Sequence, residues 1–116
     1  MNKLEELQKR YLDVVRNRDW EKFHNPKNLV MALSSEVGEL ADLFLWATGE
    51  DSKNILNTSR AQKVKDEIGD VFLYLVRLCD ELNIDPFQCA SEKLTKSESK
   101  YPVEQCKGIS KKYNEL

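Results

Sequence analysis

Two short acidic pairs are the residues of this 116-residue chain best suited to chemistry. Glu36 and Glu39 form the first pair, and Glu67 and Asp70 form the second. Each pair lies in a segment whose apolar residues recur at helical spacing, and side chains three residues apart are neighbours on a helix. Each pair can therefore hold one cation. Because Mg²⁺ prefers oxygen ligands, often a few carboxylates with substrate phosphates, the pairs predict a Mg²⁺ site between two helices.

The position of Glu36 favours this interpretation over simple exposure to water. A carboxylate within an apolar stripe is unfavourable unless it is paired, protonated or bound to a metal, and Glu36 lies near the middle of such a stripe. The alternative stays open for Glu67 and Asp70, because 20 of the 116 residues are acidic and such pairs also arise by chance. The stripe around Glu36 consists of Leu29, Leu33, Leu40 and Leu43.

The two pairs are separated by 27 residues, and the second leads into the apolar run Phe72–Val76. This pattern resembles the MazG-like all-α nucleotide pyrophosphohydrolases, most closely their dCTP pyrophosphatase branch. Two positions depart from it. Ser35 stands where the wider family often has a further Glu, and Ser97 stands where the branch tends to carry Asn, which leaves one nucleotide contact open. Other stretches that carry the likeness are 18–29, 36–46, 100–102 and 112–116.

The resemblance implies an all-α fold, a four-helix-bundle-type domain assembled as an oligomer. The homotetramer that we predict is built from dimers and shares its active site between subunits. The implied reaction is the Mg²⁺-dependent conversion of a nucleoside triphosphate, dCTP or a related deoxynucleotide, to its monophosphate and pyrophosphate. Its role would be housecleaning of the nucleotide pool. The metal-binding and catalytic residues would be Glu36, Glu39, Glu67 and Asp70; whether one of them or Asp66 orients the water stays open.

Several aromatic and polar side chains are candidates for nucleotide binding. Trp20 and Trp46 lie near predicted helix ends, where each is either an aromatic plug or a stacking platform for a base; the resemblance favours stacking. Asn28 either binds a base edge or caps its own helix. The single histidine, His24, is either structural or a donor to the nucleotide, and the resemblance places Tyr74 at the nucleotide as well. Candidate donors to a triphosphate lie near the end of the last predicted helix, where such side chains are either merely solvated or bind phosphate; the resemblance favours the last two of Lys93, Lys100 and Tyr101.

Sequence motifs and composition exclude several other classes of protein and of site. The chain has no Gly-x-Ser-x-Gly motif and no glycine loop for phosphates, so hydrolysis must use metal-activated water rather than a covalent intermediate. A net charge of −2 provides no basic field for a nucleic-acid polymer, and three scattered cysteines form no zinc pattern. No signal or membrane-spanning stretch is expected. We therefore expect a cytoplasmic protein whose partner is a nucleotide.

A rival hypothesis comes from a different class of protein. The chain would be a non-catalytic helical interaction module whose acidic face binds a partner. Trp20 and Trp46 would then be interface anchors. A response to Mg²⁺ and dCTP that disappears in Glu36→Gln would favour the enzyme, and its absence would favour the module.

Helices must position all of these residues, and we predict a single domain over residues 1–116. A first amphipathic helix is expected over 2–18. Asn25 followed by Pro26 starts a second helix, which runs to about Ala47 with Gly49 as its stop. Residues 50–58 are expected to form a polar loop.

The second half of the chain carries two further helix signals. Ser59 and Gln62 can form a capping box for a third helix that reaches about Leu82. Asp85 followed by Pro86 starts a fourth helix over 86–99, and Pro102 ends helical structure. Helices two and three would be antiparallel, with the fourth completing a bundle.

Overall fold

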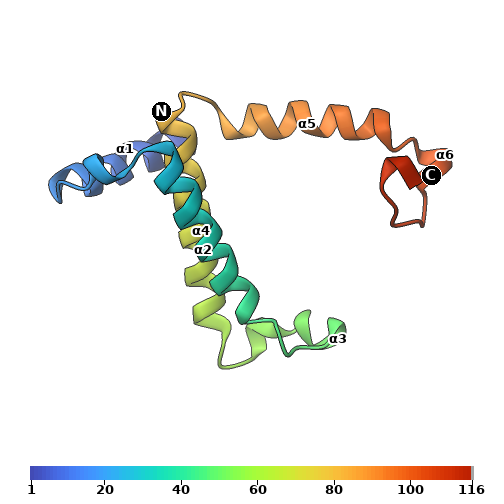
Figure 1. Ribbon diagram of the computed structural model, residues 1–116. Helices are drawn as coiled ribbons and strands as arrows, with labels where there is room; N and C mark the ends of the chain where they lie inside the picture. Colours follow the sequence, from blue (N-terminus) through green and yellow to red (C-terminus); the bar gives the residue numbers. More distant parts are fainter. Residues whose placement is uncertain (116) are drawn as a thin grey trace. The chain divides into compact units, whose positions relative to one another are not determined.

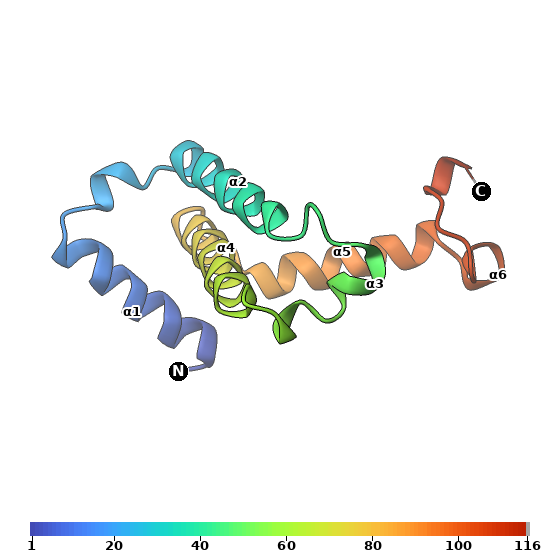
Figure 2. The ribbon, with the colours of Figure 1, turned by 90° about the horizontal axis from the view of Figure 1, so that it is seen from below.

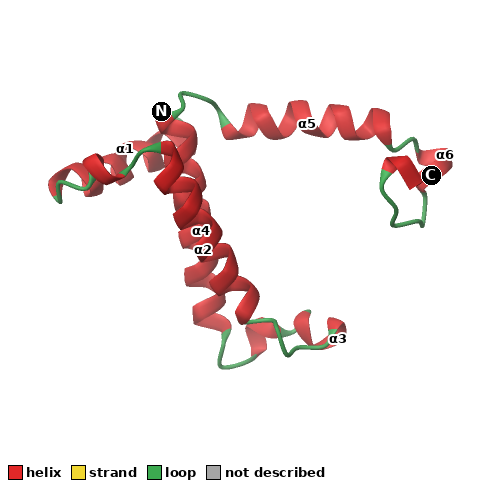
Figure 3. Cartoon of the chain, viewed as in Figure 1, coloured by secondary structure: helices red, strands yellow, loops and turns green. Residues whose placement is uncertain are grey.

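A computed structural model describes residues 1–115, and Leu116, the end of the last matching stretch, lies outside the described residues. No strand occurs among the described residues, so the prediction of an all-α fold is confirmed (Figure 3). The α-helices are α1 (Lys3–Asn17), α2 (Pro26–Asp42), α3 (Gly49–Ser52), α4 (Ala61–Glu81), α5 (Pro86–Lys100) and α6 (Val103–Cys106). Short 3-10 helices are η1 (Glu21–Phe23), η2 (Ile55–Asn57) and η3 (Tyr113–Glu115).

The chain divides into two compact units, Met1–Asn83 and Ile84–Leu116. The assignment of residues 1–116 to a single domain stays a prediction. None of the helices in the described part of the chain is both long and apolar enough to cross a membrane.

The first unit is built on α2 and α4, which run antiparallel and side by side (Figures 1 and 2). Both helices have an apolar face, and α1 also contacts α4. Burial of these faces removes apolar surface from water, which stabilises the folded chain by about 25 cal/mol for each Å² buried. The packing fixes which residues of α2 and α4 face each other. The core consists of Val15, Leu29, Ile55, Val64, Val76 and Cys79.

The start of α2 follows from the predicted local signal. The Asn25 side chain accepts a hydrogen bond from the backbone N–H of Asn28 at 2.9 Å, with Pro26 at the first helical position. The capping box predicted for α4 is absent. The N-cap of α4 is Arg60, which makes no side-chain cap hydrogen bond, and Gln62 donates instead to Asp66 at 2.9 Å.

The end of α2 differs from the prediction, since α2 ends at Asp42 and not near Ala47. The backbone N–H of Leu43 bonds to the carbonyl of Leu40 at 3.2 Å, and that of Phe44 to Ala41 at 3.0 Å. These three-residue turns tighten the chain and end the α-helix.

The predicted polar loop 50–58 contains two helical turns and a buried residue. Gly49 starts α3 instead of stopping α2, because the Thr48 hydroxyl accepts a hydrogen bond from the N–H of Asp51 at 3.0 Å and caps the turn. Ile55, in η2, is only 7% exposed and anchors this connection in the core.

The second unit contains α5, α6 and η3. Asp85 caps α5 as predicted, accepting from the N–H of Phe87 at 2.8 Å. Helical structure does not end at Pro102, because the Pro102 carbonyl accepts from Gln105 and Cys106 and starts α6. None of the α5 residues is buried within a single copy of the chain, and the role of α5 in completing a bundle stays a prediction.

Candidate functional site

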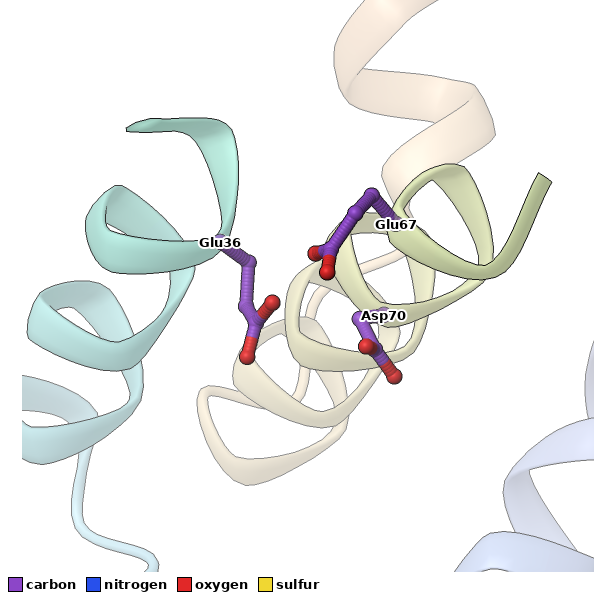
Figure 4. A group of neighbouring side chains, drawn as sticks. All are labelled: Glu36, Glu67 and Asp70. Carbon is purple, nitrogen blue, oxygen red and sulfur yellow. The ribbon is translucent and has the colours of Figure 1, made fainter. Parts of the chain in front are cut away.

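Three carboxylates converge where α2 and α4 face each other. Glu36 comes from α2, while Glu67 and Asp70 come from α4, one helical turn apart. One carboxylate oxygen from each lies within 4.8 Å of the other two. Figure 4 shows the side chains of Glu36 and Glu67 projecting into the space between the helices. The antiparallel pairing thus brings together residues that are separated by up to 34 positions in sequence (70 − 36).

Two carboxylate oxygens of this cluster lack hydrogen-bond partners among the described residues. All three side chains are half-buried, and Oε2 of Glu36 and Oε2 of Glu67 are both buried without a hydrogen-bond partner. Buried polar atoms are normally paired with protein, water or an ion. A set of oxygen ligands with excess negative charge suits a hard cation. The acidic cluster therefore fits a metal ion.

Crowding of like charges changes the protonation of Glu36. The adjacent Glu67 carboxyl, followed by burial and by the nearby Glu39, raises the pKa of Glu36 to about 7. A proton on Glu36 relieves the repulsion when no cation is bound. A bound divalent cation would replace that proton, since metal ligation requires the carboxylate form.

The raised pKa of Glu36 predicts how the stability of the metal-free protein depends on pH. The unfolded chain loses this proton near 4.5 and the folded chain near 7, so folding retains a proton between these values. The free energy of unfolding should therefore fall as pH rises from about 4.5 through about 7, and level off above. Urea denaturation with a chelator, at pH 5 and pH 8, measures this change. Glu36→Gln should show a smaller fall, and identical falls in both proteins would contradict the assignment.

Glu39, the fourth predicted carboxylate, lies at the edge of the cluster. It is exposed, and it interacts with Glu36 one turn earlier on α2. Glu39 and Glu67 both line an open groove of about 370 Å³ beside the cluster. The structure thus brings three of the four predicted ligands close enough to share one cation, and Glu39 lies next to them. The remaining lining residues of the groove are Asp42, Leu43, Lys63 and Asp66.

Tyr74 lies beside the acidic cluster, as the sequence pattern on α4 suggests. Its half-buried position raises the pKa of its hydroxyl, and the negative charges of Glu36 and Asp70 raise it further. Tyr74 therefore stays a neutral hydroxyl donor near the carboxylates at physiological pH. A donor in this position can contact a ligand held by the cluster.

The two tryptophans are not brought together within the described chain. Trp20 precedes α2 and Trp46 follows it, and Figure 2 shows these segments at opposite ends of the helix. The 17 residues of α2 span about 25 Å at 1.5 Å per residue. Trp46 is 87% exposed and Trp20 is 45% exposed, with the Arg18 guanidinium 5.7 Å from the Trp20 ring. One copy of the chain therefore offers two separate aromatic surfaces.

The other predicted nucleotide contacts have different surroundings. Asn28 donates its side-chain N–H to the backbone carbonyl of Phe23 at 3.1 Å, which favours the local role over base recognition. His24 is half-buried, and its ring centre lies 6.4 Å from that of Tyr11. The predicted phosphate donors lie in the second unit, and their contact with a nucleotide bound at the acidic cluster stays a prediction. These donors are Lys93, Lys100 and Tyr101.

Sequence reasoning missed Arg77, which is the buried charged residue of the first unit. Asp70, Tyr74 and Arg77 are spaced at i, i+4 and i+7, so they share one face of α4. Extending the acidic stripe by one more turn would have placed Arg77 on the same face of the helix, but it would not have shown that Arg77 is buried. An arginine near the end of a helix is, however, more commonly a solvated residue.

Comparisons with known proteins give a consistent result. The family model for the MazG-like family matches residues 31–116. The chain is 36% identical over 114 residues to human dCTP pyrophosphatase 1 and 35% identical to the mouse protein, covering 97% of this chain and 67% of each relative. The crystal structure of a pyrophosphatase from Archaeoglobus fulgidus superposes with a TM-score of 0.82 at 37% identity. That match covers 88% of this chain and 94% of the other.

Proposed function

Since this chain belongs to the MazG-like family, we propose that it hydrolyses dCTP or a closely related deoxynucleotide to the monophosphate and pyrophosphate, with Mg²⁺ as its cofactor. The predicted family and the predicted enzyme class, a nucleoside triphosphate diphosphatase, are confirmed by the relatives. The same relatives favour the enzyme over the non-catalytic interaction module. Removal of unwanted nucleotides from the cellular pool is the role that we propose for it.

The observation that supports the proposal most directly is the convergence of Glu36, Glu67 and Asp70. These residues would hold the metal, with Glu39 available one turn along α2. Bound Mg²⁺ would neutralise charge on the phosphates and lower the pKa of the attacking water. The two buried oxygens without partners, one on Glu36 and one on Glu67, would gain a cation as their partner.

The protein side chains bind and orient the reacting groups. Tyr74 presents a neutral hydroxyl beside the cluster, where it can donate to a phosphate or sugar oxygen. Glu39 and Asp66 lie along the groove that adjoins Glu67, and either carboxylate can accept a proton from a water placed there. No covalent intermediate between enzyme and substrate is required, because water is the nucleophile.

The proposed reaction is tested by incubating the protein with each of the common nucleoside triphosphates and Mg²⁺. We expect the fastest turnover with dCTP and release of pyrophosphate without orthophosphate. Orthophosphate as the first product would place the attack at the terminal phosphorus and overturn the proposed reaction. Equal turnover of purine and pyrimidine nucleotides would overturn the proposed substrate.

Trp46→Ala is expected to weaken nucleotide binding if Trp46 stacks on the base. Loss of a stacking face is worth about 1–3 kcal/mol, so the KM for dCTP should rise by roughly 5- to 150-fold. Mg²⁺ binding to the free enzyme, measured by calorimetry, should not change. Trp20→Ala should have the same effect, while Phe87→Ala, which removes another exposed aromatic ring, is the control. An unchanged KM in both tryptophan variants would show that neither ring contacts the base.

The distance between the two tryptophans supports a site that is shared between subunits. One chain cannot place Trp20 and Trp46 on the same base, because α2 lies between them. A second copy of the chain can supply the missing ring. We therefore propose that the enzyme is a homotetramer built from dimers, with nucleotide contacts contributed by more than one subunit.

A further inference from the structure

The indole ring of Trp20 lies at the surface of the first unit with a cation over one of its faces. The guanidinium carbon of Arg18 is 5.7 Å from the ring centroid. A guanidinium within about 6 Å of the centroid is attracted by the negative face of an aromatic ring. Trp20 is nevertheless 45% exposed. The exposed part of the indole is therefore the part that Arg18 does not cover.

A second contact holds the Arg18 guanidinium at the end of α1. Its Nη1 atom donates to the backbone carbonyl of Val14 at 3.1 Å, while the backbone N–H of Arg18 bonds to the carbonyl of Val15 at 3.3 Å. The last carbonyls of a helix lack partners within the helix, and positive charge is favourable beside them. The cation over Trp20 is thus anchored to α1.

The backbone at Trp20 is fixed as well. Asp19 has a φ angle of 55°, in the left-handed region that Asp adopts more readily than most residues, and its carboxylate pairs with the Lys22 ammonium at 2.8 Å. After this turn the backbone N–H of Trp20 bonds to the carbonyl of Val15 at 2.9 Å, and Val15 is fully buried. The torsions of the Trp20 side chain are the freedom that remains, and the ring is where Arg18 makes contact.

We propose that Arg18 is a positioning residue for Trp20, and that it holds the indole so that the uncovered face receives the base of the nucleotide. The inference rests on the proposed function, because it takes Trp20 as a stacking surface for that base. A face covered by a guanidinium is closed to a base, so the base stacks on the opposite face. Arg18 itself does not contact the nucleotide in this arrangement.

Arg18 acts by restricting an exposed ring before the base arrives. An exposed side chain samples several rotamers, and the apparent affinity falls with the fraction of molecules that hold the competent one. A cation–π contact at an exposed site changes such a preference by about 2- to 5-fold. Loss of Arg18 should therefore weaken binding of the base by this factor. Because the stack is the same in the ground state and the transition state, KM should rise while kcat stays unchanged.

The first test follows the Trp20 ring in the full chain without any nucleotide. The chain contains two tryptophans, so Trp46→Phe leaves Trp20 as the sole source of indole fluorescence. In this background Arg18→Ala should increase quenching of the emission by acrylamide and lower its time-resolved anisotropy, since the ring gains an open face and more motion. Arg18→Lys keeps a cation that can lie over the ring and should restore most of both properties. Arg10→Ala, which removes an exposed arginine from α1, should change neither. Unchanged quenching and anisotropy in Arg18→Ala, with helical circular dichroism retained, would overturn the proposal.

The second test compares deoxycytidine, which has no phosphate, with dCTP in the presence of Mg²⁺. In Arg18→Ala the dissociation constant of deoxycytidine, measured by calorimetry, and the KM for dCTP should both rise by about 2- to 5-fold. A loss confined to dCTP would show that Arg18 donates to a phosphate, and it would overturn the positioning role. The fluorescence measurements separate this inference from the proposed function. If Arg18→Ala frees the Trp20 ring but the parent protein binds neither ligand, the contact positions the ring and the substrate assignment fails.

Discussion

Glu36→Gln is expected to abolish hydrolysis while leaving the helical fold intact. The substitution removes one of three converging ligands and keeps nearly the same side-chain volume. Charge stabilisation by a bound metal contributes several kcal/mol in such reactions, so the loss in kcat should be on the order of 100-fold or more. Glu39→Gln, Glu67→Gln and Asp70→Asn should show the same loss.

The same substitution should stabilise the metal-free protein at pH 8. There Glu36 is ionised despite a pKa of about 7 and is repelled by the Glu67 carboxylate, and an amide removes this repulsion. Steady-state kinetics at saturating Mg²⁺, together with thermal unfolding in chelator, measures both effects. Glu6→Gln, at an exposed position in α1, is the control and should change neither. Normal hydrolysis by two or more of the four variants would show that the metal site lies elsewhere.

The parts of the fold that could be predicted are those determined by local sequence. The starts of α2 and α5 depend on Asn25 and Asp85, whose side chains accept backbone hydrogen bonds next to a proline. These contacts form within four residues and need no knowledge of the rest of the chain. The apolar spacing of the α4 region likewise identified a long helix, because the pattern repeats over several turns.

The parts that could not be predicted depend on packing between distant segments. Nothing local in residues 43–47 forbids a helix, yet the chain tightens after Asp42 and leads to Ile55, which is buried in the core. Gly49 has two possible uses, as a stop or as a start, and the Thr48 cap decides in favour of a start. Local propensity is a weak guide where tertiary contacts decide the outcome.

The candidate site also combines features that local sequence predicts with features that depend on packing. The four carboxylates were predicted from their spacing, but only the antiparallel pairing of α2 and α4 determines that Glu36 faces Glu67 while Glu39 remains at the edge. Arg77 was missed because its burial is a property of the packed structure. The separation of Trp20 from Trp46, in contrast, follows from local sequence, because the predicted second helix already lies between them.

The surface of the first unit has one further feature that bears on assembly. The face of α4 that points away from the core carries a row of exposed apolar side chains at i, i+4 and i+7. Such a stripe on a helix normally packs against another element, and contiguous exposed apolar surface is typical of protein interfaces. The exposed fractions are 53% for Ile68, 43% for Phe72 and 38% for Leu75.

Ile68→Glu is expected to prevent assembly and, with it, hydrolysis. A carboxylate in an apolar subunit interface would lose its water without gaining a partner, which costs several kcal/mol and is repeated at every symmetric contact. Light scattering should therefore change from a tetramer mass to the mass of a dimer or a monomer. Because we propose that each nucleotide site draws residues from more than one subunit, activity on dCTP should be lost together with the tetramer.

Two controls separate this effect from unfolding and from added charge. Asn57→Glu places the same charge at an exposed position in η2 and should remain tetrameric and active. The helical circular dichroism of Ile68→Glu should match that of the parent protein, since Ile68 is not part of the buried core of the single chain. A parent protein that is monomeric at micromolar concentration and hydrolyses dCTP at full rate would contradict both the assembly and the shared site. A monomeric Ile68→Glu variant with full activity would contradict the shared site alone, because each chain would then hold every residue that the reaction needs.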